Sequence, residues 1–339
     1  MTEQPALLGP AEVRELAERL GVSPTKKLGQ NFVIDPNTVR KIVRLAGVEA
    51  GDRVIEVGPG LGSLTLGITE AGADVTAVEI DHRLAAELPQ TARAMQPQIF
   101  ADPEHPRLRV IRSDALELTL PDLLRRHTSH SAATGSIAEF PPQARSCDSS
   151  VAQDDGAVRA QDDGAISMMP EVLVANLPYN VSVPILMHLL ELIPGLRRGL
   201  VMVQSEVGRR IAAGPGSKEY GAPSAKAAWY GDWRIAGTVS RRIFWPVPGV
   251  DSVLVGYERL AEPRGDEAER RLVFELVNAA FAQRRKMLRQ ALQPVLGPLD
   301  PAVATIEAAG VDATARAEQL GIAEYLAIAR AHSRASDVR

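Results

Sequence analysis

Short apolar segments alternate with helical patterns through the middle of this chain of 339 residues. Of all the features of the sequence, this alternation restricts the fold most. Apolar runs of this length are typical of strands buried on both faces, and strands separated by helices form a mostly parallel sheet covered on both sides. The sequence therefore predicts an α/β fold. The expected strands are Arg53–Val57, Val75–Ile80, Leu108–Arg112, Val172–Ala175 and Leu200–Gln204.

Helical patterns flank this region at both ends. Residues 10–20 have helical spacing, and Asp35–Pro36 supplies an N-cap and first turn for a second helix, which Gly47 closes. After about residue 260 the pattern is helical only. The helices expected there are Arg270–Phe281, Gln283–Leu292, Pro301–Ala309 and Ala323–Ala331. We expect an N-terminal helical extension over residues 1–50, an α/β domain over 51–260 and a small all-helical domain over 266–333.

The stretch from residue 128 to residue 169 interrupts the alternation. It is rich in Ser, Ala, Gly, Gln and Asp, and it repeats the hexapeptide Ala152–Ala157 at Ala160–Ala165. Few of its residues can enter a core, so we expect a disordered surface insertion. Its acidic excess accounts for the net charge of −4, so the rest of the chain is neutral.

Basic residues gather in the second half of the chain. They include Arg209, Arg210, Arg284, Arg285 and Lys286. A basic side on a neutral body is compatible with binding to nucleic-acid phosphates. On charge alone, solvated helix faces explain the same pattern equally well.

The composition indicates a soluble globular protein, with 45% apolar and 24% charged residues. The N-terminus lacks the basic and apolar regions of a signal peptide, and no apolar run approaches the ~18–20 residues that span a bilayer. Cys147 is the only cysteine, so neither an intrachain disulfide nor a thiol-based metal site is expected. We therefore expect a cytoplasmic protein with no bound metal and no membrane partner.

A glycine-rich segment, Glu56-Val-Gly58-Pro-Gly60-Leu-Gly62, follows the first expected strand and opens a helix. Glycines permit a tight turn and the close approach of a ligand to the backbone, and a helix N-terminus offers free N–H groups. The spacing differs from the G-x-G-x-x-G of dinucleotide-binding folds. A plain strand-to-helix turn, the alternative, would need only one glycine.

Acidic residues mark the ends of the next two expected strands. Glu79 is placed to accept both hydroxyls of a ribose, and Asp114 can take a hydrogen bond from an adenine amino group. Taken singly, an acid at a strand end is more often a helix N-cap. Several such signals in order along the chain are hard to ascribe to turns.

The segment Asn176-Leu-Pro-Tyr179 follows the fourth expected strand, which Pro178 ends. Open α/β folds bind ligands at the carboxyl ends of their strands. There the amide oxygen of Asn176 can accept a hydrogen bond from an amino group, and Tyr179 can stack on a flat ring. This combination suits a nucleobase whose exocyclic amine is altered, although a simple loop would also give so short a match.

Together these motifs resemble the S-adenosylmethionine site of class I methyltransferases, and Asn176–Tyr179 resembles the active-site motif of those that methylate amino groups. More narrowly, the chain is similar to the KsgA/RsmA family of rRNA adenine dimethyltransferases. Further matching segments are Lys27–Val33, Gln204–Ile211, Tyr220–Ser224, Phe244–Val253 and Phe281–Leu288. The resemblance covers nearly the whole chain except the insertion. It implies a Rossmann-like class I methyltransferase sheet followed by a small all-helical C-terminal domain.

The resemblance also implies the residues of the site. The implied contacts to S-adenosylmethionine come from Asn31, Val33, Gly58, Gly60, Glu79, Asp114 and Asn176. Val33 stands where the family commonly has leucine, which matters little if a backbone group makes the contact. The implied catalytic residues are Asn176, Leu177, Pro178, Tyr179 and Phe244. Phe244 would stack on the face of the adenine opposite Tyr179; a core phenylalanine is the alternative.

For RNA binding, the resemblance and the charge pattern point to Arg209, Arg210, Arg284, Arg285 and Lys286. The last three are expected on a helix of the C-terminal domain, where they would contact rRNA phosphates. The alternative is a solvated helix start held by the packing of Phe281 and Leu288.

The activity implied by the resemblance is dimethylation of the N6 amines of two neighbouring adenosines near the 3′ end of 16S rRNA. The expected partner is this rRNA within the 30S subunit during ribosome biogenesis, and the expected oligomeric state is a monomer. One alternative is an Erm-like enzyme that methylates 23S rRNA, but the segments Lys27–Val33 and Phe281–Leu288 favour the small-subunit family. A second alternative is an assembly factor without catalysis, against which the intact Glu79 and Asn176 argue. A nicotinamide dehydrogenase is weaker still, because the glycine spacing differs.

Overall fold

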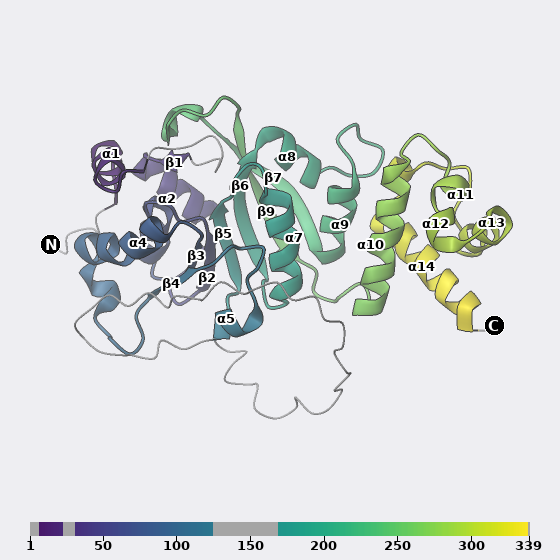
Figure 1. Cartoon of the computed structure of the whole chain (residues 1–339), viewed down its shortest axis with the longest axis horizontal. Coiled ribbons are helices and arrows are strands. Elements are labelled where there is room, and N and C mark those ends of the chain that lie inside the picture. Colours follow the sequence, from purple (N-terminus) through teal and green to yellow (C-terminus); the bar gives the residue numbers. More distant parts are fainter. Residues whose placement is uncertain (1–6, 23–30, 125–168, 338–339) are drawn as a thin grey trace, which may run out of the picture.

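The computed structural model describes residues 7–22, 31–124 and 169–337. Its centre is a seven-stranded sheet with the order β4-β3-β2-β5-β6-β9-β7, beside a small two-stranded sheet of β1 and β8, and helices cover both faces of the large sheet (Figure 1). The strands are β1 (Phe32–Val33), β2 (Arg53–Val57), β3 (Asp74–Glu79), β4 (Leu108–Arg112), β5 (Val172–Asn176), β6 (Arg198–Gln204), β7 (Gly231–Val239), β8 (Phe244–Trp245) and β9 (Ser252–Arg259). The expected α/β fold is confirmed.

Helices fill the intervals between the strands and form the C-terminal end of the molecule. The α-helices of the first half are α1 (Pro10–Arg19), α2 (Pro36–Leu45), α3 (Ser63–Glu70), α4 (His82–Met95) and α5 (Leu120–Leu124). Those of the middle are α7 (Ser182–Leu192), α8 (Ser205–Ile211) and α9 (Ala222–Tyr230). The C-terminal ones are α10 (Glu267–Ala282), α11 (Leu288–Ala291), α12 (Gln293–Leu296), α13 (Leu299–Ala308) and α14 (Ile322–Asp337). Short 3₁₀ turns are η1 (Pro97–Phe100), η2 (Arg241–Ile243) and η3 (Ala317–Gln319).

The parallel strands lie where the sequence predicts them. β2 and β4 have the predicted bounds, β3 is shifted by one residue at both ends, and β5 and β6 differ by one or two residues at one end. β2 pairs in parallel with β3 on one side and with β5 on the other. The order of the strands along the chain reverses between β2 and β5, and open α/β sheets form their ligand crevice at such a point.

Two antiparallel strands at one edge were not predicted from the sequence. β9 pairs antiparallel with β6 and also with β7. β7 lacks a clear apolar alternation, since only its first and last residues, Gly231 and Val239, are buried. Its pairing also shifts register between Ile235 and Gly237, which breaks the two-residue period on which strand prediction depends.

The two faces of the sheet contribute to two separate cores. Ile55 and Leu173 are completely buried in one core, which also contains Leu186 and Leu189 of α7. The neighbouring residues along the same strands, such as Val54, belong to the other core with the apolar residues of α1–α4. Successive side chains of a strand point to opposite faces, so one continuous apolar run serves both cores.

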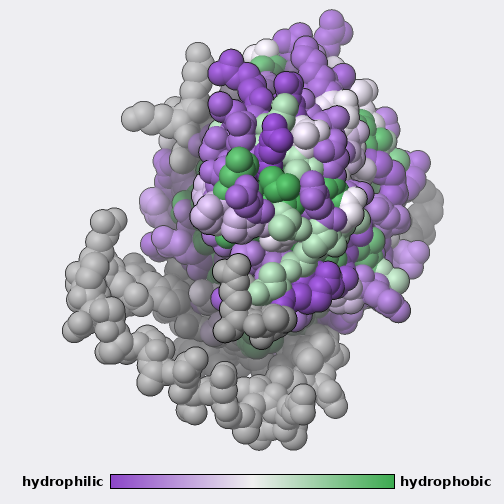
Figure 2. All heavy atoms as spheres, turned by 90° about the vertical axis from the view of Figure 1, so that its right-hand side faces the viewer, coloured by the Kyte–Doolittle hydropathy of each residue, from purple (hydrophilic) through white to green (hydrophobic). Residues whose placement is uncertain are grey.

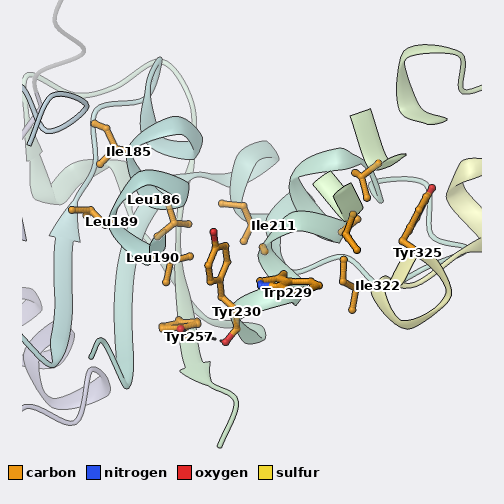
Figure 3. Close-up of a cluster of buried hydrophobic side chains, with 14 of the residues drawn as sticks. Ile185, Leu186, Leu189, Leu190, Ile211, Trp229, Tyr230, Tyr257, Ile322 and Tyr325 are labelled. Atoms are coloured by element: carbon orange, nitrogen blue, oxygen red, sulfur yellow. Dashed lines mark hydrogen bonds between the residues drawn. The ribbon is translucent and has the colours of Figure 1, made fainter. Parts of the chain in front are cut away.

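The C-terminal helices share a core with the sheet. One cluster of buried residues runs from α7 through Tyr230 of α9 and Tyr257 of β9 to Tyr325 of α14 (Figure 3). Phe274 of α10 makes edge-on ring contacts with Trp229 at 6.3 Å and with Tyr230 at 6.1 Å. The segment at residues 262–265, between β9 and α10, therefore joins two parts that pack on each other, and the domain boundaries given above remain predictions.

One predicted helix of this region is wrong. The helix expected at Gln283–Leu292 is absent over its first half, because α10 ends at Ala282 and residues 283–286 form a turn. The next segment bonds to a neighbouring loop instead: the N–H of Leu288 donates to the carbonyl of Ala315 at 2.8 Å. Tertiary hydrogen bonds thus replace those that would continue the helix.

Two expectations fall outside the described residues. The insertion expected at 128–169 lies outside them apart from Met169, and so do Lys27–Gln30 of the matching N-terminal segment. Within the described ranges, no helix is both long and apolar enough to cross a membrane.

Candidate active site

A cavity of about 270 Å³ opens at the point between β2 and β5 where the strand order reverses. Its walls come from the glycine-rich loop after β2, from the ends of β3 and β4, and from the turn after β5. The predicted site residues that line it are Asn31, Val33, Gly58, Gly60, Glu79, Asp114, Asn176, Leu177, Pro178 and Tyr179. The structure thus brings together nearly all the residues assigned to the cofactor and to catalysis.

The glycine-rich loop needs glycine at Gly60. This residue has a φ of +60°, a left-handed conformation that other residues adopt only with strain. A Cβ built on it would also meet Cε1 of the Phe32 ring at 2.9 Å. The loop therefore passes close under Phe32, and its backbone rather than any side chain forms this wall.

Glu79 is a buried carboxylate held by the backbone around it. It is 4% exposed, and it accepts hydrogen bonds from the N–H of Gly60 at 3.1 Å and from the N–H of Asp81 at 2.9 Å. Burial raises the pKa of Glu79, while these two hydrogen bonds oppose the rise. Since each carboxylate oxygen accepts only one of these bonds, each keeps a lone pair for a ligand hydroxyl.

Two lining residues, Glu56 and Ser63, had no role in the sequence reading. Glu56 is 1% exposed and accepts a hydrogen bond from Oγ1 of Thr65 at 2.6 Å. Burial raises its pKa to about 8, so the acid is largely protonated at neutral pH. The Oγ atom of Ser63 is buried without a hydrogen-bond partner among the described residues. Their position in the sequence, within and just after the glycine-rich segment, is the signal that could have identified them as lining residues.

Part of the cavity lining is apolar. Ile80 and Leu116 line it and are 56% and 38% exposed. Between them, Asp114 uses one carboxylate oxygen to accept the N–H of Leu116 at 2.9 Å. A flat ring that lies against these apolar side chains would have the second carboxylate oxygen of Asp114 as an acceptor for an amino group.

The turn after β5 presents acceptors to the cavity. The Nδ2 of Asn176 donates to the carbonyl of Asn31 at 3.0 Å, which fixes the amide and leaves its oxygen without a donor among the described residues. The carbonyl of Leu177 likewise accepts no hydrogen bond from them. Tyr179 is bonded through its hydroxyl to Oγ of Ser252 at 2.8 Å, and burial raises its pKa.

Phe244 does not lie with these residues. It is 1% exposed, belongs to the core on the α1–α4 face, and pairs through β8 with Val33 of β1. It is absent from the residues that line the cavity. The structure therefore supports the core alternative for Phe244 and gives no second ring opposite Tyr179.

The predicted RNA-binding residues are exposed but differ in their partners. Arg209 and Arg210 lie on α8, where Arg210 pairs with Glu206 at 3.1 Å. Arg284 pairs with Glu318 at 2.8 Å. The side chains of Arg285 and Lys286 have no hydrogen bond or ion pair with the described residues; they are exposed on a turn, not on the predicted helix. The end of the molecule formed by the C-terminal helices is mainly hydrophilic, with a few apolar residues near its centre (Figure 2).

The cavity fits S-adenosylmethionine. The buried Glu79 with its spare lone pairs suits a ribose diol, and the apolar Ile80 and Leu116 suit an adenine ring. The buried hydroxyl of Ser63, which lacks a partner, suits a polar group of the amino-acid portion. Asn176 lies close to the glycine-rich loop: a Cβ built on Gly58 would lie 3.8 Å from the backbone carbonyl oxygen of Asn176.

Comparison with known proteins agrees with this geometry. The family model described as ribosomal RNA adenine dimethylase matches residues 22–333. The protein named ribosomal RNA small subunit methyltransferase A of Leifsonia xyli is 56% identical over 95% of this chain and 98% of its own length. The protein of the same name from Thermobifida fusca is 50% identical over 95% of each chain.

Solved structures show the same fold at lower identity. The 23S rRNA methyltransferase ErmE is 23% identical, with a TM-score of 0.56 over 89% of this chain and all of its own. A dimethyladenosine transferase from Plasmodium falciparum is 19% identical, with a TM-score of 0.62 over 87% of this chain and 94% of its own. Fold, cavity and sequence agree: this chain belongs to the ribosomal RNA adenine dimethylase family, whose members are S-adenosylmethionine-dependent methyltransferases.

Proposed function

We propose that this enzyme dimethylates the N6 amines of two neighbouring adenosines near the 3′ end of 16S rRNA, within the small ribosomal subunit. The observation that carries the chemistry is the geometry of Asn176, a lining residue whose amide nitrogen is held by the carbonyl of Asn31 and whose amide oxygen has no donor among the described residues. The choice of the small subunit is supported by the relatives that share about half of their residues with this chain and carry that name.

The adenine amine is a poor nucleophile because its lone pair is delocalised into the ring. The amide oxygen of Asn176 and the carbonyl of Leu177 are two acceptors for its two N–H bonds. Bonds to both would favour a tetrahedral nitrogen whose lone pair points away from these two acceptors and toward the methyl group of the bound cofactor. The bound cofactor supplies an electrophilic methyl group on its sulfonium. The residues of the turn then act by orientation, and no strong base is needed because a methylated ammonium loses its proton readily.

Tyr179 would hold the adenine by stacking. An adenosine must leave its base stack to reach an enclosed site, which costs free energy. Stacking on an aromatic ring offsets part of that cost, by roughly 1–3 kcal/mol per stacked base. The hydrogen bond between the Tyr179 hydroxyl and Ser252 fixes the tilt of the ring. Since Phe244 is buried in the core, we assign the stacking to Tyr179 alone.

The exposed Arg285 and Lys286 would contact rRNA phosphates, together with Arg209 of α8. Arg284 would contribute less, because its guanidinium is already paired with Glu318. We further propose that the enzyme acts as a monomer in the cytoplasm. An Erm-like enzyme that acts on 23S rRNA has the same fold, but ErmE is only 23% identical to this chain. A factor without catalysis would not need the buried acceptors of the cavity.

One assay tests the proposal. The protein is incubated with labelled S-adenosylmethionine and with unmethylated 30S particles, free 16S rRNA or 50S particles, followed by nucleoside analysis. We expect N6,N6-dimethyladenosine from 30S particles. Label in 50S particles would move the assignment to the Erm-like activity, and the absence of label from every substrate would favour the assembly factor.

A further inference from the structure

The segment between β8 and β9, residues 246–251, exposes apolar side chains to solvent. Val247 is 64% exposed and Val250 is 45% exposed. The segment forms part of the green loop that projects beyond the sheet beside β1, at the same end of the sheet as α8 (Figure 1). An isolated exposed valine needs no explanation. Two exposed valines in one short loop, next to the site proposed for a nucleic-acid base, do need an explanation.

Both ends of this loop are fixed to residues that line the cavity. At one end, Trp245 pairs with Phe32 in the β1–β8 sheet, and their rings stack at 6.4 Å. At the other end, Ser252 is bonded to the hydroxyl of Tyr179 at 2.8 Å. Phe32 and Tyr179 both belong to the cavity wall. The loop therefore starts and finishes at the cavity.

The loop is also braced from within. Asp251 forms an ion pair with Arg241 at 3.0 Å, and its carbonyl accepts the N–H of Ser205 at 2.8 Å. Pro248 is buried between the two exposed valines. These contacts keep the valines on the outside, because the loop cannot turn them inward without breaking the contacts at both ends.

Positively charged side chains lie near both ends of the loop. Arg242 is exposed just before β8, and its side chain has no ionic partner among the described residues. Arg209 is exposed on α8, the helix whose first residue bonds to Asp251. An apolar loop with a cation near each end is compatible with a nucleic acid, in which phosphates flank the stacked bases.

We propose that Val247 and Val250 form an apolar wedge that enters the RNA base stack at the place that the target adenosine leaves. This inference rests on the proposed function and adds to it the residues that keep the stack open. Proteins that kink or open nucleic acids commonly insert aliphatic side chains between base steps, and extrusion of a base is a cost that such an insertion offsets.

The test compares wild-type protein with Val247→Ser on two substrates. One is the unmethylated small ribosomal subunit, and the other is a short single-stranded RNA with the same adenosines, in which little stacking has to be broken. We expect Val247→Ser to lower kcat/KM on the subunit about tenfold and to leave the value on the single strand within about twofold. Val247→Ile, which keeps an aliphatic side chain, should restore the activity on the subunit.

A matched control is Leu299→Ser on α13, an equally apolar residue that is 46% exposed and lies in the C-terminal helices. It should leave both rates unchanged. A second readout is the fluorescence of 2-aminopurine placed at the target position of an RNA hairpin, which rises when the base leaves its stack. Wild-type protein should raise it, and Val247→Ser should not.

Equal loss of activity on both substrates, or no loss on either, would overturn the wedge. The fluorescence readout does not require methyl transfer. If only the wild-type protein raises the fluorescence but it methylates no RNA, the wedge is supported and the proposed function is contradicted. If the wild-type protein methylates RNA and both proteins raise the fluorescence equally, the proposed function is supported and the wedge is contradicted.

Discussion

The two sides of the cavity are built differently. On the cofactor side, the N–H of Gly60 donates a hydrogen bond to Glu79, and the space beside Gly60 is too small for a side chain because of the Phe32 ring. On the side proposed for adenosine, Asn176 and Leu177 line the cavity and their oxygens have no donor among the described residues, and the loop beside Tyr179 exposes valines. The first side has its hydrogen bonds in place without a ligand, whereas under the proposed function the acceptors of the second side are bonded only by the RNA. Changes to the first should therefore act on cofactor affinity or stability, and changes to the second on turnover.

The largest effect is expected from Asn176→Ala. Loss of one oriented polar group from a catalytic site typically costs about 10²–10³-fold in kcat, and RNA affinity should persist because the basic residues are untouched. Single-turnover methylation and RNA binding measure the two quantities. Asn278→Ala on α10, an exposed asparagine far from the cavity, is the matched control. Unchanged turnover of the Asn176 variant would disprove the proposed role of the amide.

Glu56 should make stability depend on pH. Its pKa rises from 4.5 in the unfolded chain to about 8 in the folded protein. Between these values the folded protein holds a proton that the unfolded chain has released, so stability falls as pH increases, by at most ~1.4 kcal/mol per pH unit. Glu56→Gln cannot titrate and should remove this part of the slope. Urea unfolding at several pH values between the two pKa values measures it, and parallel curves for both proteins would contradict the assignment.

Glu79→Gln should weaken cofactor binding about 10- to 100-fold. A glutamine has one oxygen, so its NH₂ group must face the N–H of either Gly60 or Asp81, and the charge-assisted bonds to the ribose are lost. Calorimetry with S-adenosylmethionine measures the change. RNA affinity is the internal control, since a fall in both would mean that the two sides are not independent.

Two substitutions of Tyr179 distinguish the stacking of its ring from the hydrogen bond of its hydroxyl. Tyr179→Ala should raise KM for the RNA by roughly 5- to 150-fold, the equivalent of ~1–3 kcal/mol for one lost stack. Tyr179→Phe keeps the ring and loses only the bond to Ser252, so its KM should rise much less. Steady-state kinetics of the two variants distinguish the roles, and equal KM values for both would rule out stacking.

The smallest effect is expected from Arg285→Ala, which removes one phosphate contact. The dependence of RNA affinity on salt should become shallower by about one unit in the log–log slope, and cofactor affinity should not change. Arg284→Ala is the comparison: its guanidinium is paired with Glu318, so its effect on the slope should be smaller. Binding titrations at several salt concentrations measure both, and a steeper loss for Arg284 would contradict the ranking.

Sequence reasoning was accurate where the signal is local. Gly60, Glu79 and Asn176 each follow an apolar strand within a few residues, so the topology alone brings them to one edge of the sheet. It failed where the outcome depends on distant segments. Phe244 is buried by strand pairing with Val33, more than two hundred residues earlier in the chain, and the turn at residues 283–286 follows from bonds to the loop around Ala315.

The core shared between the sheet and the C-terminal helices has a mechanical consequence. Because Tyr230, Phe274 and Tyr325 are packed in one apolar cluster, the helices cannot swing on their linker without exposing that cluster to water. The separation between the basic turn at residues 283–286 and Asn176 is then a fixed length. If RNA contacts the basic turn as proposed, its target adenosine has to lie at that fixed distance from the contact, so the dimensions of the folded RNA would contribute to its selection.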